Sequence, residues 1–190
     1  MKHLAKIAMA VVALALVTGP AFAATDAETV AEFKKAGESA EFFNKAYGYA
    51  VFPTIGKGGI GVGAAHGTGG VYQGGKRVGE VTMNQVSVGL QFGGQAYSEI
   101  IFFQDKSAFD NFTSGNFEFD AGASVIAIKA NASASAGTQG ATSAAGTRNK
   151  GSQTEGAGYY KGMAVFTIAK GGLMYEATLA GQKFKYKPGG

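Results

Sequence analysis

Glycine restricts this chain more than any other feature, because residues 55–76, IGKGGIGVGAAHGTGGVYQGGK, contain ten glycines in 22 positions. Such density is compatible with a phosphate-binding loop, with a flexible linker, or with strands that bend and pack closely. Aliphatic and aromatic residues lie between the glycines and argue against a linker. A G-x-G-x-G pattern at residues 59–63 places glycines on one strand face and Ile60 and Val62 on the other. The stretch therefore predicts a β structure in which backbones approach closely.

The phosphate-binding alternative fails on spacing. Residues 70–77 nearly match G-x-x-x-x-G-K-[ST], but Arg77 occupies the position of the metal-binding hydroxyl. Residues 78–88 then alternate as in a strand, whereas a phosphate loop leads into a helix whose N-terminus faces the phosphates. We expect neither a nucleotide nor a nucleic acid among the partners of this chain.

The first 23 residues have the form of a cleaved export signal. A basic start precedes an apolar run at residues 7–17, which is too short to cross a bilayer as a helix. An Ala-Phe-Ala sequence at residues 21–23 predicts cleavage before Ala24. The chain has no cysteine, which excludes a lipid-modified cysteine and suits an oxidising compartment. We expect an exported protein that is periplasmic, peripheral to the outer membrane, or secreted.

The remaining 167 residues, 24–190, suit a single domain whose charges are unevenly distributed. Residues 24–140 carry eight Lys/Arg against 11 Asp/Glu, whereas residues 141–190 carry seven against two. The basic C-terminal part is typical either of a surface that meets an anionic partner or of an ordinary solvated face. Residues 132–158 consist mostly of Ala, Ser, Gly and Thr, and this composition predicts a mobile loop.

The apolar periodicity changes from helical to strand-like near Gly48. Residues 25–47 predict helices that begin at a Thr25-x-x-Glu28 capping box and are interrupted near Gly37. Strands are predicted afterwards, together with one short helix at residues 105–112. The strand predictions are a hairpin of residues 86–92 and 96–104 turning at Gly93-Gly94, a strand at 117–133, and strands at 159–168 and 173–179 joined by a turn at 170–172. The predicted class is α+β: one β-rich domain with N-terminal helices and either a strongly twisted, Gly-rich antiparallel sheet or a small half-open barrel.

Four blocks of the sequence, taken in order, resemble the SYLF domain family. They are YGYAVFPTIGKGGIGVGAAHGTGGVY at residues 47–72, VSVGLQFGGQ at 86–95, residues 117–130, and residues 166–181, which contain KGGLMYEATLAG. The resemblance extends over about residues 27–186. It implies a β-rich domain with flanking helices and an affinity for phospholipid membranes.

The chain also departs from that family. It has no tryptophan, and residues 137–141 lack the proline and the arginine of the family's Gly-Pro-x-Gly-Arg turn. Given these departures and the export signal, we expect this chain to have neither the phosphoinositide binding nor the actin binding of eukaryotic members.

Residues that could build an active site are scarce. After the first 23 residues His66 is the sole histidine, and no cysteine accompanies it, so a structural zinc site is not expected. Glu118 and Asp120 share one strand face and are expected to meet solvent. No G-x-S-x-G sequence is present for a serine nucleophile. We expect no catalytic residues, no metal and no cofactor, and therefore not an enzyme.

Basic residues suggest lipid contact at three places: beside aromatic residues in the N-terminal helices and in the C-terminal strand, and at Lys76-Arg77, which we expect in a hairpin turn. Alternative interpretations are a core-packing helix, a turn charged for solubility and a solvated edge strand. The candidate lipid-binding residues are Lys34, Lys35, Lys45, Phe33, Phe42, Phe43, Lys76, Arg77, Lys183, Lys185, Lys187, Phe184 and Tyr186.

The function predicted from these features is a non-enzymatic module that binds phospholipid membranes, with basic and aromatic residues at anionic headgroups. One alternative is a β-barrel of the bacterial outer membrane, since export, alternation and glycine richness occur there too. Another is a protein-interaction or adhesion module that uses the same sheet. Lipid selectivity and oligomeric state stay open at this level.

Overall fold

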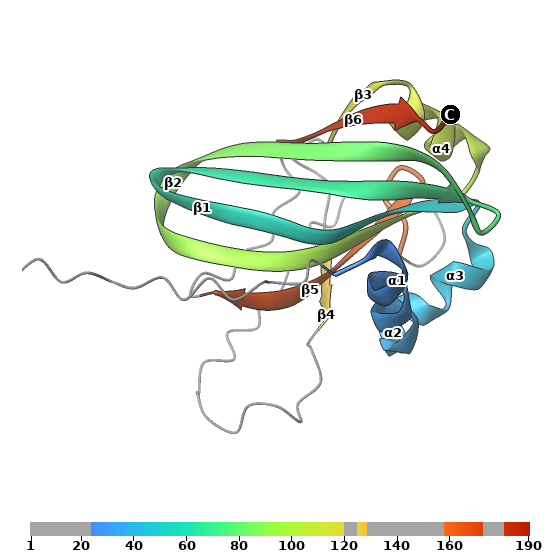
Figure 1. The fold of residues 1–190 in the computed structure, drawn as a ribbon, viewed down its shortest axis with the longest axis horizontal. Helices are drawn as coiled ribbons and strands as arrows, with labels where there is room; N and C mark the ends of the chain where they lie inside the picture. The colour runs from blue at the N-terminus through green and yellow to red at the C-terminus, as the bar shows by residue number, and fades with distance from the viewer. Residues whose placement is uncertain (1–23, 120–124, 129–157, 173–180) are drawn as a thin grey trace, which may run out of the picture.

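A computed structural model describes residues 24–119, 125–128, 158–172 and 181–190 (Figure 1). The elements, in chain order, are α1 Asp26–Lys35, α2 Gly37–Ala40, α3 Phe42–Lys45, β1 Gly48–Gln73, β2 Lys76–Phe103, α4 Lys106–Thr113, β3 Asn116–Glu118, β4 Val125–Ile128, β5 Met163–Gly172 and β6 Gln182–Pro188. The predicted β-rich α+β class is confirmed. The expected export signal, almost all of the predicted loop at 132–158 and the predicted strand at 173–179 lie outside the described residues.

Helix α1 begins at the predicted capping box. The Thr25 hydroxyl accepts the backbone N–H of Glu28 at 3.2 Å, and the Glu28 carboxylate accepts the backbone N–H of Thr25 at 2.8 Å. The bond from the Thr25 backbone lowers the pKa of the Glu28 carboxyl. Helix α1 ends before Ala36, which is extended, and α2 begins at Gly37, so the predicted interruption is confirmed. Three short helices result in place of one long helix.

Strands β1 and β2 form one long antiparallel hairpin that is folded back on itself (Figure 1). Its turn is Gly74-Gly75, where both residues have positive φ values, +56° and +77°, that glycine adopts without strain. The predicted hairpin turn at Gly93-Gly94 is wrong, because β2 continues through both residues while they pair with β1. The pairing register shifts between Ile60 and Val62, where β1 and β2 turn back.

The glycine-rich stretch does pack backbone against backbone, as its pattern predicts. A Cβ atom at Gly69 would overlap the carbonyl oxygen of Val51, and one at Gly67 would lie 2.6 Å from Cγ1 of Ile55. The two arms of β1 therefore pass each other at a distance that only glycine permits. Among the described positions of residues 60–68, the even-numbered side chains are exposed, whereas residues 63, 65 and 67 are buried.

The remaining strands pair along the other edge of β2. Strand β6 pairs with the first part of β2 and β5 with its last part, while β3 extends the sheet beyond β6 and β4 extends it beyond β5. All pairs are antiparallel except β4 with β5, which is parallel. Residues 170–172, predicted as a turn, are instead the last residues of β5, and Gly171 and Gly172 pair with β2.

Two hydrophobic clusters hold these layers together. One cluster lies inside the folded hairpin and includes Phe52, Phe103 and Phe184, with Phe109 and Phe112 of α4 packed against them. The second cluster lies on the other face of the β2–β5 pair. Its members Phe33, Ile100, Phe102 and Phe166 are packed beneath α1–α3. Successive residues of one strand, such as 102 and 103 of β2, point to opposite faces of the sheet and thus belong to different clusters.

Candidate functional site

Strand β6 presents three lysines to solvent in a row. Lys183, Lys185 and Lys187 are exposed and alternate with residues that face the core, as the sequence predicts. We call these three residues the lysine row. Phe184, between them, is only 1 % exposed and packs on aromatic rings of α4 and β3. Tyr186 is half-buried, and its hydroxyl donates to the carbonyl oxygen of Val78 at 3.0 Å.

Phe184 is therefore structural, and its assignment to lipid contact is wrong; Tyr186 is half-buried, and its hydroxyl is held by Val78. Alternation predicts that lysines and rings take opposite faces, but it does not say which face meets the core.

Acidic residues lie at both ends of the lysine row and leave its centre without one. Lys183 is an exposed partner of Glu118, with Nζ and Oε2 separated by 3.6 Å, a pair of little energetic weight. Lys187 lies opposite Glu80 of β2. The cross-strand neighbours of Lys185 are neutral: Thr82 of β2 and Asn116 of β3.

The aromatic residues of α1–α3 also point inward. Phe33 is fully buried, which makes its assignment to lipid contact wrong and supports the core-packing interpretation of these helices. Phe42 and Phe43 are half-buried, with ring centroids 5.5 and 4.8 Å from that of Phe102. Their rings pack against the sheet, so neither presents a free aromatic face.

The lysines of these helices remain at the surface. Lys34 and Lys35 are exposed, with the Nζ of Lys34 lying 5.3 Å from the ring centroid of Phe43. Lys45 forms an exposed pair with Glu41 at 2.8 Å. The helices lie below the folded hairpin in Figure 1, whereas β6 lies at its upper edge, so the two sets of lysines belong to separate surfaces.

Lys76 and Arg77 follow the Gly74-Gly75 turn and differ in their surroundings. Lys76 is exposed, whereas the Nε of Arg77 lies 3.4 Å from Oδ2 of Asp26 at the start of α1. The Tyr72 hydroxyl donates to the same carboxylate oxygen at 2.8 Å. Burial, and next this hydrogen bond, raises the pKa of Tyr72 to about 12. Arg77 therefore contacts α1 through Asp26, while its side chain is still 48 % exposed.

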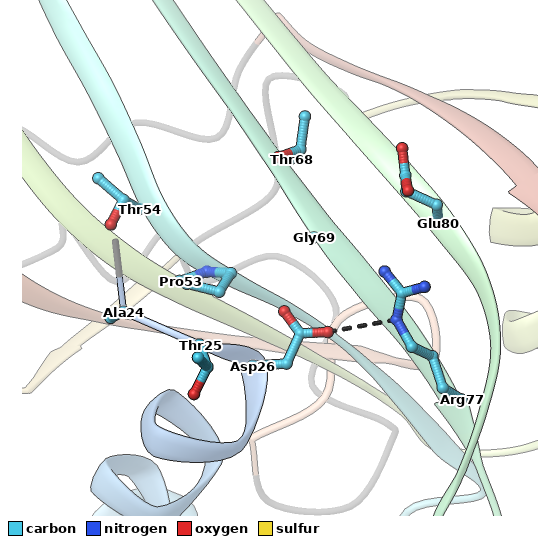
Figure 2. A pocket seen from close by; sticks show the side chains of 9 residues that line it. All are labelled: Ala24, Thr25, Asp26, Pro53, Thr54, Thr68, Gly69, Arg77 and Glu80. Carbon is cyan, nitrogen blue, oxygen red and sulfur yellow. Dashed lines mark hydrogen bonds and ion pairs between the residues drawn. The ribbon is translucent and has the colours of Figure 1, made fainter. Parts of the chain in front are cut away.

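A hollow of about 370 Å³ lies between the start of α1 and the sheet (Figure 2). Figure 2 shows Arg77 and Glu80 pointing into it from β2, with Asp26 reaching toward Arg77 from the helix. The residues that line it are Ala24, Thr25, Asp26, Pro53, Thr54, Thr68, Gly69, Arg77 and Glu80. The sequence alone does not reveal this hollow, because it brings together residues from four separate segments. It holds charged groups of both signs: Asp26 and Glu80 are acidic and Arg77 is basic.

A buried acid is the second feature that the sequence analysis missed. Glu99 of β2 is fully buried, and the Nε2 of Gln182 donates to its Oε2 at 3.2 Å. Burial raises the pKa of Glu99 to about 7, and the bond from Gln182 offsets part of that effect. Burial, and next the neighbouring Glu99, raises the pKa of Tyr97. Nothing in the alternation at 97–103 distinguishes Glu99 from a surface acid, since its burial follows from the folding of the hairpin.

The described residues hold no cluster of three or more His, Cys, Asp or Glu side chains suited to a metal ion. His66 lies in β1, where its Nδ1 is 2.8 Å from Oδ1 of Asn84. No helix within the described ranges is both long and apolar enough to cross a membrane.

Fold and surface together define a β-rich module in which a folded glycine-rich hairpin is covered by short helices. A family model described as Ysc84, Las17-binding protein actin regulator, matches residues 84–187. The chain is also 30 % identical over 145 residues to beta cell expansion factor A of Aeromonas veronii. This alignment covers 75 % of the chain but 46 % of the relative, so the chain spans about half the length of that protein. No solved structure matches the chain.

The chain belongs to the Ysc84, or SYLF, family, and the predicted resemblance is confirmed. The matched residues extend from the middle of β2 to the end of β6 and thus contain the lysine row. Membership supports, at the family level, a lipid-binding or actin-related module.

Proposed function

We propose that this protein is a non-enzymatic module that binds anionic phospholipid membranes through the lysine row of β6. Family membership supports the general class, lipid binding. The observation that carries the proposal is the geometry of β6: three exposed lysines on one strand face, anchored from beneath by the buried ring of Phe184. Because that ring is buried in the core, the strand keeps Lys183, Lys185 and Lys187 on its solvent-facing side.

Strand geometry makes the row suited to a charged surface. Alternate residues of a strand lie about 6–7 Å apart, so three lysines span a distance comparable to a few lipid headgroups. A lysine near an anionic bilayer contributes roughly 1 kcal/mol, which gives the row about 3 kcal/mol before its acidic neighbours are considered. Glu80 and Glu118 reduce this at the two ends, and Lys185 has neutral cross-strand neighbours. Lys185 is therefore the expected centre of the contact.

Co-sedimentation with liposomes tests the proposal. The protein starting at Ala24 is mixed with anionic or neutral liposomes at low and at raised salt. We expect binding to anionic liposomes that weakens as salt screens the charges. Equal recovery in the pellet with and without liposomes would refute it.

Two charge-reversed variants identify the surface. Reversal of Lys183, Lys185 and Lys187 to Glu is expected to abolish binding, whereas reversal of Lys34 and Lys35 on α1 is expected to retain it. A single-residue comparison uses Lys185→Glu against Lys106→Glu on α4, since both lysines are exposed. Equal loss in all variants would indicate a non-specific response to charge.

The proposal also includes the location of the protein. We propose that residues 1–23 direct export and are removed, which places the module in the periplasm or outside the cell. The mass of the protein recovered from the periplasmic fraction tests this, with a start at Ala24 expected. A protein-interaction module is the alternative, and it predicts no preference for liposomes of either charge. Actin is not part of the proposal, because an exported bacterial-type protein does not meet it in its own compartment.

A further inference from the structure

Three large aliphatic side chains are exposed at one end of the molecule. Ile60, Val62 and Val86 are 77, 58 and 70 % exposed, and they are the exposed large hydrophobic residues of the part of the chain that the structure describes. Ile60 and Val62 border the register shift where β1 turns back, and Val86 lies opposite Ala64 on β2. The bend of the hairpin lies at the end of the sheet away from α1–α3 (Figure 1). We call these three residues the aliphatic tip.

The fold leaves these side chains no inward alternative. A Cβ atom at Gly59 would overlap the carbonyl oxygen of Val62, so the inner face of the bend has no room for a side chain. A one-residue slip in register, which would bury the aliphatic residues, would drive side chains into that backbone. The close backbone packing at the glycines therefore exposes these three side chains, whichever rotamers they adopt.

The tip and the lysine row lie on the same face of the sheet. Val86 and Asn84 are two residues apart on β2, and the buried Gln85 lies between them. Asn84 is the cross-strand partner of Lys183. Cross-strand partners point to the same side, so the surface passes from aliphatic residues at the bend to cations along β6 within one or two residue spacings.

This combination fits a bilayer better than a protein partner. Stable protein interfaces bury at least about 1,000 Å² around a cluster of anchor residues, which three aliphatic side chains on a bend do not provide. A bilayer requires less, because a few apolar groups enter the region between headgroups and acyl chains while adjacent cations meet anionic headgroups. The positive charge of the lysine row favours an anionic phospholipid surface as the occupant.

We propose that the aliphatic tip inserts shallowly into the membrane that the lysine row attracts. The inference rests on the proposed function and adds to it the penetrating residues and the orientation. The bend of the hairpin enters the bilayer, and α1–α3 stay on its aqueous side. Electrostatic attraction by the lysine row then brings the protein to the membrane. Insertion of Ile60, Val62 and Val86 keeps it bound when raised salt screens the charges.

Depth-dependent quenching tests this directly, because the chain has no native cysteine. An environment-sensitive fluorophore is attached to Val62→Cys and, as the control, to Glu38→Cys on α2, which is exposed on the helical side. Vesicles of phosphatidylglycerol and phosphatidylcholine carry a spin label near the headgroups. We expect blue-shifted emission and quenching for the label at 62 and neither change for the label at 38.

A second variant measures the contribution to affinity. Ile60→Ser with Val62→Ser removes apolar surface without a change in charge, and circular dichroism checks that the sheet is retained. We expect its affinity for these vesicles to fall roughly tenfold or more, because partial burial of two aliphatic side chains is lost. The remaining binding is expected to be more sensitive to salt than that of the unaltered protein.

The outcomes separate the two proposals. If the unaltered protein binds vesicles but the label at 62 is unquenched and the double variant binds equally well, the insertion proposal is overturned and the proposed function stands. If the unaltered protein binds no vesicle, both are overturned. A blue shift that depends on protein concentration without lipid would assign the tip to a second copy of the chain and overturn insertion.

Discussion

Replacement of Glu99 by Gln is expected to stabilise this protein at neutral and alkaline pH. Glu99 is fully buried inside the folded hairpin, and the side-chain amide of Gln182 donates a hydrogen bond to its carboxyl group. Burial raises the pKa of Glu99 from an ordinary value of 4.5 to about 7. Glutamine has nearly the same shape, keeps an oxygen that accepts from Gln182, and never ionises.

The sign follows from proton linkage. Because the folded state holds the proton of Glu99 more tightly than the unfolded state does, stability falls as pH rises from about 4.5 to 7 and is constant above that. One pKa unit corresponds to about 1.4 kcal/mol, so a rise from 4.5 to about 7 removes about 3 kcal/mol. Glu99→Gln lacks this loss. The variant should match the unaltered protein near pH 4 and exceed it by about 3 kcal/mol at pH 8, which is roughly 6–12 °C in Tm for a chain of this size.

Thermal and urea unfolding, followed by circular dichroism from pH 4 to pH 8, measure this difference. Glu38→Gln on the exposed surface of α2 is the matched control, and its stability should follow that of the unaltered protein at every pH. The reasoning is refuted if the difference between Glu99→Gln and the unaltered protein does not change with pH. It is also refuted if the variant is less stable at pH 8, since that would mean the charged carboxylate has a stabilising partner.

Three further substitutions test the fold. Gly69→Ala forces a methyl group against the backbone of the other arm of β1 and should lower the free energy of unfolding by about 2 kcal/mol or more in urea. Gly56→Ala is the control, because the space around its Cβ is open, and it should change stability by less than about 1 kcal/mol. Equal effects of the two variants would contradict the close approach of the two arms. Thr25→Ala removes the capping box of α1 and should lower the free energy of unfolding by about 1 kcal/mol, and an unchanged urea midpoint would argue against the cap. Phe184→Ala should lower the free energy of unfolding by about 3–5 kcal/mol, whereas Lys185→Ala should lower it by less than about 0.5 kcal/mol. A mild effect of Phe184→Ala would indicate that the ring is not buried.

Local signals in the sequence were sufficient for the start of α1 and the helix break near Gly37, but not for the turns between strands. The Thr25 and Glu28 side chains satisfy backbone donors within one turn of helix, so their spacing alone predicts the start of α1. The interruption near Gly37 and the N-cap at Asp105 of α4 are local in the same way.

Alternation identified the two faces of each strand but not what covers them. Lys185 and Phe184 were correctly assigned to opposite faces, yet the sequence analysis placed both at a lipid surface. The hairpin turn was misplaced for a related reason: Gly74-Gly75 and Gly93-Gly94 have the same local chemistry, and the pairing of β2 with β1 selects the first pair.

By itself, the sequence determined that this chain would be rich in strands, with glycine on one face so that backbones meet closely. That conclusion needs only the period of a strand and the missing Cβ of glycine. Tertiary structure alone decided which residues the folded hairpin encloses and which it exposes. Glu99 is buried and Ile60 is exposed because β1 turns back between residues 60 and 62 together with the paired part of β2, and that bend sets contacts between residues far apart in the sequence. Periodicity describes a strand's own geometry, whereas burial depends on the strand that lies across it.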